Sequence, residues 1–493
     1  MDSGAHGDKK QAVAVDAEAQ AAATPTRDAD ADIEPGEIRL PTGEIVNASG
    51  HRQELERNFI LSVNNGGAPG VIYEFIAAGA FYLCVTVSLA ELASAIPSSA
   101  GVYHWASVTP GRRAGRAVGF FAGYWNALAY ALSSASLAAV AGQAVLQMWA
   151  LTHEGYEMRR WHVFAAYLLV IWANTAVLAF ANPLAAAHQQ RAHGSRHAYS
   201  FTPFVNIPIA MGVQMTASFL STIVYFVVLV YSITDFDAVL NTTAAFPLTE
   251  IYRQSSGGST AAAIGLTVVV LLPILGSALG AMMTASRVFW TLARDGAVPF
   301  PRALARVSPR WRNPLGAILL VAAFCTAMGL LYLVSDVAFQ AMVGSFVVLV
   351  ALSYLAALLP FLLRGRRGLE PGPFFVRGVP GTVISAVSCG FMMVWVVFYC
   401  FPYAQPVTAA GMNYSSLIVG GLTILVGAWW FRIRKTYNGP PVLLMGDIRI
   451  QEAADERHKV EFFKARIAGR LDDSRTRIFK ATNTATGEIS GFA

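Results

Sequence analysis

Long apolar runs constrain this chain more than any other feature of its sequence. About nine runs of roughly 20 or more mostly apolar residues lie between residues 71 and 431, and each could cross a bilayer as a helix. Inside hydrocarbon a backbone must satisfy its own hydrogen bonds, so such chains fold as helical bundles or closed barrels. The runs are longer than barrel strands and do not alternate in polarity, so we predict an all-α polytopic membrane protein.

The composition agrees with this class. Of the 493 residues, 55% are hydrophobic and 13% are charged, and the mean hydropathy is +0.48. A soluble domain carries about twice that charged fraction. The formal net charge of +6 comes with arginines in short loops between apolar runs, which is how membrane orientation is encoded. We therefore expect membrane lipid as a partner and no nucleic acid.

The chain divides by composition into three parts. Residues 1–57 lack a sustained apolar period and are predicted to be a disordered tail, and residues 436–493 form a charged cytoplasmic tail with one amphipathic helix around 448–470. The transmembrane domain is 58–435. Its predicted spans are about 71–96, 117–150, 162–181, 207–233, 263–289, 315–334, 338–363, 379–401 and 413–431.

The distribution of arginines predicts the orientation. The basic loops should face the cytoplasm; they are 97–116, 182–206, 290–314, 364–378 and the stretch after 431. The other loops then face outward, including the glycosylation sequons at Asn241 and Asn413. Strict alternation leaves the N-terminal tail outside. We expect an integral protein of the plasma membrane.

The end of the first span combines a carboxylate, a helix breaker and aromatic side chains. The helix should stop at Pro97, because proline lacks the backbone donor and clashes with the preceding turn. Gly101 lets the chain bend. Tyr103 and Trp105 are predicted to lie in the headgroup layer, where an amphipathic ring has one wet end.

Glu91 has two interpretations. A carboxylate deep in a span is costly and indicates a coupling-ion or gate role. Because Glu91 lies within about two turns of Pro97, solvation at the membrane interface explains it more simply. The sequence leaves both open.

The second span carries a series of polar and aromatic side chains. Ser133 and Ser136 share one helix face, as do Asn126 and Tyr130. Such side chains can line a polar cavity, and they can equally bind neighbouring helices together. The aromatic rings could also contact an ammonium group through cation–π interactions.

Signs of enzyme or metal chemistry are weak. His188, His193 and His197 are separated by arginines and have no acid or cysteine beside them, so no metal site is predicted. The four cysteines lack CxxC spacing and are interpreted as small buried hydrophobes. Without a phosphate-cradling glycine motif or a nucleophile elbow, neither a cofactor nor an enzymatic activity is expected.

Three stretches resemble a known family. Glu91 to Trp105 (Glu-Leu-Ala-Ser-Ala-Ile-Pro-Ser-Ser-Ala-Gly-Val-Tyr-His-Trp) resembles the signature after the second helix of amino acid–polyamine–organocation (APC) permeases. Ser286 to Pro299 is similar to the end of their eighth helix, and Phe339 to Pro360 to their tenth. The resemblance covers about residues 58–440 and is nearest the fungal choline and GABA permease branch. It implies a LeuT-like bundle that transports choline-like cations or amino acids by alternating access. The coupling ion is left open, with a proton as one candidate.

The resemblance is incomplete in one respect. The family has twelve helices, of which the first and sixth are broken at the midplane to hold substrate and ion. Here helix one is reduced to 58–63 at most, and helices five and six are missing between about 183 and 204. Only secondary lining can be carried over, and it comprises Ser133, Ser134, Ser136, Gly280, Ala281, Gly344 and Ser345.

A membrane-embedded enzyme is disfavoured, because the sequence shows no catalytic constellation. Two hypotheses remain. The first is a solute permease, with Glu91 as a possible coupling or gate residue. The second is a truncated, transport-incompetent product of an alternative transcript or faulty gene model. The missing helices predict that the chain as written does not transport, because no other segment supplies the broken helices that bind solute.

Overall fold

The computed structural model describes most of the apolar part of the chain. It covers 67–180 apart from 99, 112 and 154, and 203–440 apart from 236–237, 240–241, 243, 245, 312, 335, 368 and 403–411. In the tails it describes two antiparallel strand pairs, β1 (Glu37–Arg39) with β2 (Ile45–Asn47) and β3 (Lys480–Thr482) with β4 (Ile489–Phe492). Asn241, the three histidines at 188–197 and the predicted helix at 448–470 lie outside the described residues.

Nine helices in the described part of the chain are long and apolar enough to cross a membrane, which confirms the predicted class. They are α3 (Gly67–Ala95), α5 (Gly115–Ala150), α6 (Arg160–Phe180), α8 (Pro203–Tyr231), α11 (Thr260–Arg294), α13 (Leu315–Val334), α14 (Asp336–Leu363), α15 (Gly378–Phe398) and α16 (Ser415–Ile433). Three short helices accompany them, α4 (Val102–Val108), α10 (Leu248–Ser255) and α12 (Pro301–Leu304).

The helix boundaries follow the punctuation of the sequence. α3 ends at Ala95, two residues before Pro97, and Gly101 adopts a φ of 52° immediately before α4. α11 continues to Arg294, beyond the predicted end at 289, with a basic residue in its last turn. A cation there is favourable because the carbonyl end of a helix carries partial negative charge.

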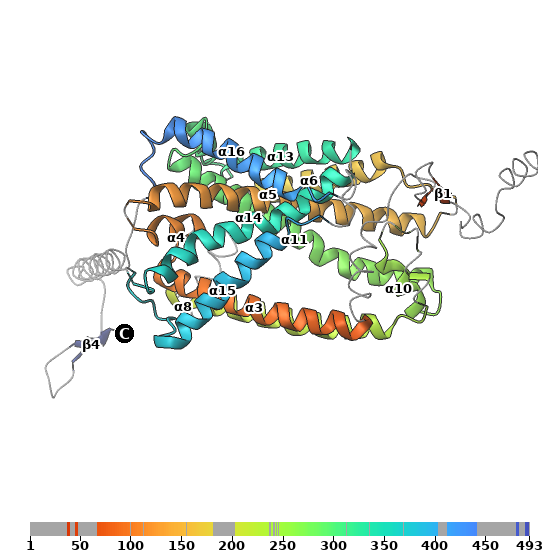
Figure 1. Cartoon of the computed structure of the whole chain (residues 1–493), viewed down its shortest axis with the longest axis horizontal. Coiled ribbons are helices and arrows are strands. Elements are labelled where there is room, and N and C mark those ends of the chain that lie inside the picture. The colour runs from red at the N-terminus through yellow and green to blue at the C-terminus, as the bar shows by residue number, and fades with distance from the viewer. Residues whose placement is uncertain are drawn as a thin grey trace, which may run out of the picture. The chain divides into compact units, whose positions relative to one another are not determined.

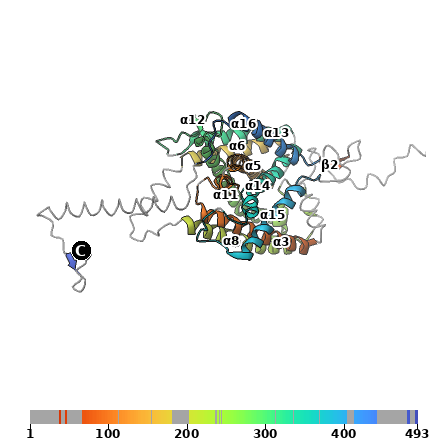
Figure 2. The same cartoon turned by 60° about the vertical axis from the view of Figure 1, so that its left-hand side comes forward.

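The chain divides into two compact units, which we describe separately. The smaller comprises 1–71, 143–163 and 229–268, and the larger comprises 72–142, 164–228 and 269–493. In the larger unit α14 packs against α15, α16, α13 and α4 (Figure 1), and the turned view in Figure 2 again shows α15 beside α14. All predicted lining residues and Glu91 belong to this larger unit.

Candidate functional site

The last turns of α3 lie inside the larger unit. Every residue from Ser88 to Ile96 is buried, and the apolar ones other than Ala90 join a cluster with side chains of α4, α14 and α15. The indole Nε1 of Trp105 donates a hydrogen bond to the carbonyl of Ile96 at 2.9 Å and so closes the helix end. Glu91 lies within this stretch and is carried into the protein interior with it.

Glu91 forms a buried ion pair with Arg366. The two side chains are 2% and 4% exposed, and Nη2 of Arg366 lies 2.7 Å from each carboxylate oxygen. The backbone N–H of Val376 donates to Oε1 of Glu91 at 3.0 Å. Solvation of Glu91 at the membrane interface is therefore wrong, because protein groups satisfy the carboxylate. A coupling or gate role stays a prediction.

The C-terminal turn of α14 places Arg366. The N–H of Gly365 donates to the carbonyl of Leu362 at 2.9 Å and the N–H of Arg366 to that of Phe361 at 2.8 Å, which is the Schellman pattern. Both residues adopt left-handed backbone, with φ of 64° and 58°. A Cβ at Gly381 would overlap the guanidinium of Arg366, so this glycine leaves the space that the ion pair needs.

Two hydroxyl contacts also attach α3 to the segment that contains α15. Ser94 Oγ accepts a hydrogen bond from the N–H of Phe374 at 2.9 Å. Ser88 Oγ lies 3.1 Å from Ser388 Oγ. Together with the ion pair, these contacts hold the end of α3 against both the 364–377 loop and α15.

A second set of contacts joins α4, the end of α11 and the residues after α16. The phenol of Tyr103 donates to Oδ2 of Asp295 at 3.0 Å and lies 2.7 Å from the phenol of Tyr437. Burial raises the pKa of both Tyr103 and Tyr437 well above the ordinary value. Both phenols therefore stay protonated and able to donate. The headgroup-layer prediction for Tyr103 and Trp105 is wrong, because both are buried in protein.

These contacts bring predicted cytoplasmic loops to one end of the larger unit. Arg364 also donates to the carbonyl of Thr109 at 3.1 Å, and the side chain of Asn313 donates to the carbonyl of Leu178 at 2.7 Å. The arginine pattern predicts that these loops share one side. Which side of the membrane they face stays a prediction.

Of the two sequons predicted to face outward, the one at Asn413 is buried. Its side chain donates to the carbonyl of Tyr399, so it is not presented for glycosylation.

A polar and aromatic seam lies between α5 and α14. We call it the α5–α14 seam, and it comprises Asn126, Tyr130, Phe346, Ser353 and Tyr354. Asn126 Nδ2 donates to Ser353 Oγ at 3.2 Å, and the phenols of Tyr130 and Tyr354 lie 3.3 Å apart. The rings of Tyr130 and Phe346 have centroids 6.3 Å apart. The polar faces of α5 and α14 therefore lie against each other.

The three predicted serines of α5 lie in different surroundings. Ser134 is fully buried and donates to the carbonyl of Ala278 on α11 at 3.2 Å. Ser136 is half-buried and donates to the carbonyl of Leu132 in its own helix. Ser133 is buried. Ser134 therefore binds α5 to α11, and Ser136 has its hydrogen-bonding capacity partly met locally.

The predicted small residues of α11 and α14 do not converge on one point with those serines. Gly280 is half-buried and Ala281 is buried, on the same helix as the carbonyl that Ser134 contacts. Gly344 is half-buried. Ser345 is fully buried, with Oγ 2.7 Å from the carbonyl of Ala341 and 3.5 Å from that of Ser415, so it lies toward α16.

Metal chemistry finds no support in the described residues, among which no group of three or more His, Cys, Asp or Glu side chains could hold an ion.

The comparison with known proteins decides the class of this protein. The sequence pattern described as "Amino acid permease" matches residues 45–189 and 195–424. This chain belongs to the amino acid permease family. Its members and the relatives below are transporters and not enzymes.

Several relatives of this permease are similar over most of its length. A choline transporter from Saccharomyces cerevisiae is 26% identical and covers 78% of this chain and 79% of its own. A GABA-specific permease from the same yeast is 24% identical, with coverages of 82% and 86%. The amino-acid permease BAT1 from Arabidopsis thaliana is 24% identical, with coverages of 83% and 96%.

The sequence did not identify Arg366 as the partner of Glu91. The two residues are 275 positions apart, and the basic loop was interpreted only as an orientation signal. One local signal was available. Gly365 lies two residues after the end of a span, between Arg364 and the pair Arg366-Arg367, and a glycine at this place is typical of a helix C-terminus that turns back on itself. That signal predicts the turn but not its partner.

Proposed function

We propose that this permease is a secondary-active transporter of choline-like organic cations or amino acids such as GABA, coupled to protons and cycling by alternating access at the plasma membrane. Family membership and the choline and GABA relatives support the substrate class. The observation that carries the proposal is the α5–α14 seam, because it places aromatic rings, an amide and hydroxyls together inside a membrane bundle.

The chemistry of the seam suits such solutes. A quaternary ammonium has no N–H to donate and is held by aromatic faces, which Tyr130 and Phe346 offer. A solute carboxylate needs donors. The amide of Asn126 has a second N–H besides the one bonded to Ser353, and the hydroxyl of Ser133 can donate, whereas Ser136 must first release its bond to the carbonyl of Leu132. A Cβ at Gly280 would meet nothing within 4 Å, so α11 has room there, and Ala281, Gly344 and Ser345 are small side chains on α11 and α14.

The Glu91–Arg366 pair has a proposed role in the same cycle. It joins α3 to the loop between α14 and α15, at the end of the larger unit where the basic, predicted cytoplasmic loops meet. We call this the arginine-rich end. Alternating access requires that one end of a bundle be closed while the other is open. We therefore assign the pair to holding the arginine-rich end closed, and it must separate or move as a unit when that end opens.

The test is uptake by purified protein in liposomes. Labelled choline and GABA should accumulate saturably under an inward proton gradient, and Ser136→Trp should abolish uptake without preventing insertion. Ser218→Trp is the matched control, because Ser218 is exposed on α8. Unchanged uptake in Ser136→Trp would return the α5 serines to helix packing. Absence of uptake from folded protein would contradict the proposal.

A second candidate, a transport-incompetent chain, is favoured by two observations. Only 6% of the most apolar stretch of α8 is buried, and its polar side chains Gln214, Thr216, Ser218 and Ser221 are exposed. The alignment with the choline transporter runs over 446 residues yet covers 78% of this 493-residue chain, so the relative has positions without a counterpart here. Sequencing the transcript across the codons for 62–64 and 191–205 tests this candidate independently.

A further inference from the structure

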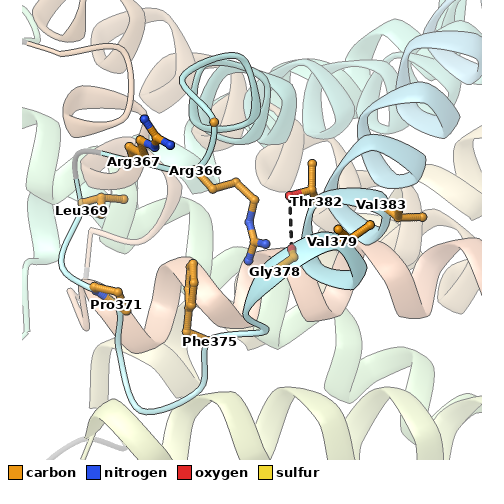
Figure 3. A pocket seen from close by; sticks show the side chains of 10 residues that line it. Arg366, Arg367, Leu369, Pro371, Phe375, Gly378, Val379, Thr382 and Val383 are labelled. Atoms are coloured by element: carbon orange, nitrogen blue, oxygen red, sulfur yellow. Dashed lines mark hydrogen bonds between the residues drawn. The ribbon is translucent and has the colours of Figure 1, made fainter.

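A hollow of about 690 Å³ lies at the turn between α14 and α15 (Figure 3). One wall is the C-terminal turn of α14 with Arg366 and Arg367, and the other is the first turn of α15. Because both helices are candidate membrane spans, this hollow lies where two spans end. It is therefore positioned at a membrane interface.

The first turn of α15 makes the hollow attractive to anions. α15 is 21 residues long, and its N-cap residue Arg377 makes no side-chain capping bond. The first backbone N–H groups of a helix have no intrahelical partner and carry partial positive charge. Gly378 and Val379, in this first turn, line the hollow.

The guanidinium of Arg366 supplies an independent observation. Its side chain is 4% exposed, and Figure 3 shows it running between the ring of Phe375 and Gly378. Nη2 is bonded to Glu91 and to the carbonyl of Val376, but the buried Nε has no hydrogen-bond partner among the described residues. A buried N–H of a charged group without an acceptor is costly, and an anionic oxygen would satisfy it.

The remaining walls are mainly apolar, with Thr382 as the polar side chain among them. Val379 is 75% exposed and Val383 is 53% exposed, one turn apart on α15, and Leu369, Pro371 and Phe375 also line the hollow. Among the described lining residues there is no carboxylate, while Arg367 adds an exposed positive charge. A free anion would use only the basic part of this hollow. A molecule with an anionic head and an acyl chain would use both parts.

We propose that this hollow binds the phosphate of an anionic membrane lipid. The phosphate lies over Arg366, Arg367 and the first turn of α15, and the acyl chain lies along Val379 and Val383. Basic hollows between spans on the cytoplasmic side are suited to anionic headgroups, which also matches the orientation predicted for this end.

Native mass spectrometry of the detergent-purified full chain tests the proposal with phosphatidylglycerol, phosphatidylcholine and inorganic phosphate as separate probes. We expect a bound phosphatidylglycerol that survives transfer, with at least fivefold weaker retention of phosphatidylcholine. Arg367→Gln should weaken phosphatidylglycerol binding about fivefold, as expected for one arginine near a lipid surface. Arg302→Gln, an equal charge change at another exposed arginine, should have no effect.

A second variant tests the apolar wall. Val383→Asn, which removes apolar surface without adding a charge, should reduce phosphatidylglycerol binding while leaving the elution profile of the protein unchanged, because Val383 is exposed. Three results would overturn the proposal. They are equal retention of the two lipids, equal loss in Arg367→Gln and Arg302→Gln, and inorganic phosphate displacing phosphatidylglycerol completely at equal concentration.

Discussion

The last turns of α3 and the span α8 are both apolar in sequence but differ in how they are held. Residues 88–96 of α3 are all buried, and the carboxylate and hydroxyls in that stretch have protein partners. Only 6% of the most apolar stretch of α8 is buried, and polar residues such as Gln214 and Ser218 are exposed at its surface.

The difference shows what holds a span in place when lipid is the solvent. Lipid tails are as apolar as leucine, so apolar surface alone does not choose a neighbour. α3 has specific partners in a loop and in α15. α8 contacts α3 through aromatic rings, with Phe219 and Phe226 beside Phe75. Polar contacts to the 364–377 loop and to α15 therefore determine the position of the end of α3.

The largest effect is expected from breaking the buried ion pair. Glu91→Gln leaves Arg366 buried without its counter-charge, so the free energy of unfolding should fall by about 3–5 kcal/mol. Thermal unfolding in detergent measures this. The same substitution at Glu74, an exposed residue of the same helix, should change stability by less than about 0.5 kcal/mol.

A double variant sharpens this prediction. Glu91→Gln combined with Arg366→Met removes both charges and should recover part of the loss, because no unpaired charge stays buried. Equal destabilisation by Glu91→Gln and Glu74→Gln would show that the pair does not hold α3.

Matched glycine substitutions compare the packing around α5 with the packing around α8. At Gly123 of α5 a Cβ would lie 2.7 Å from Cδ2 of Tyr103 and 2.9 Å from Cδ2 of Leu292. Gly123→Ala should therefore destabilise by about 1–3 kcal/mol. At Gly212 of α8 a Cβ would meet nothing within 4 Å, and Gly212→Ala should be neutral or stabilise by up to about 1 kcal/mol. Equal shifts in the two melting curves would contradict the difference in packing.

Matched amide substitutions compare the polar groups themselves. Asn126→Leu removes the hydrogen bond to Ser353 in the α5–α14 seam and should cost about 0.5–2 kcal/mol. Gln214→Leu on α8 exchanges an exposed amide for an apolar side chain and should not destabilise. If Gln214→Leu costs as much as Asn126→Leu, a protein group or a partner covers that face of α8.

The smallest effect concerns pH at the arginine-rich end. Burial lowers the pKa of His104 in α4, with an opposing effect of Asp295 and a reinforcing one of Arg294. The folded protein holds this imidazole neutral, so stability is fully present above the unfolded pKa near 6.5 and falls as pH drops below it. The slope is at most about 1.4 kcal/mol per pH unit. The difference between the melting temperatures at pH 7.5 and 5.5 should become smaller in His104→Gln. An unchanged difference would show that His104 is not the group responsible.

The sequence predicted the class, the number of candidate spans and most helix ends, because each depends on local apolar length, proline and glycine. It could not predict where Glu91, Tyr103 and Trp105 point. Aromatic and acidic residues near a span end suit the headgroup layer equally well. The partner of Glu91, Arg366, lies 275 positions away, and the partners of Tyr103, Asp295 and Tyr437, lie 192 and 334 positions away. For the serines of α5 the sequence left lining and packing open, and the contact of Ser134 with α11 favours packing for that residue alone.

The most direct test of the proposed function is solute uptake by the 493-residue protein in sealed liposomes, with insertion verified on the same sample. The proposal predicts saturable, proton-gradient-dependent accumulation of choline, GABA or another amino acid that is lost in Ser136→Trp. Folded, inserted protein that accumulates none of these solutes would contradict it and would favour the transport-incompetent candidate.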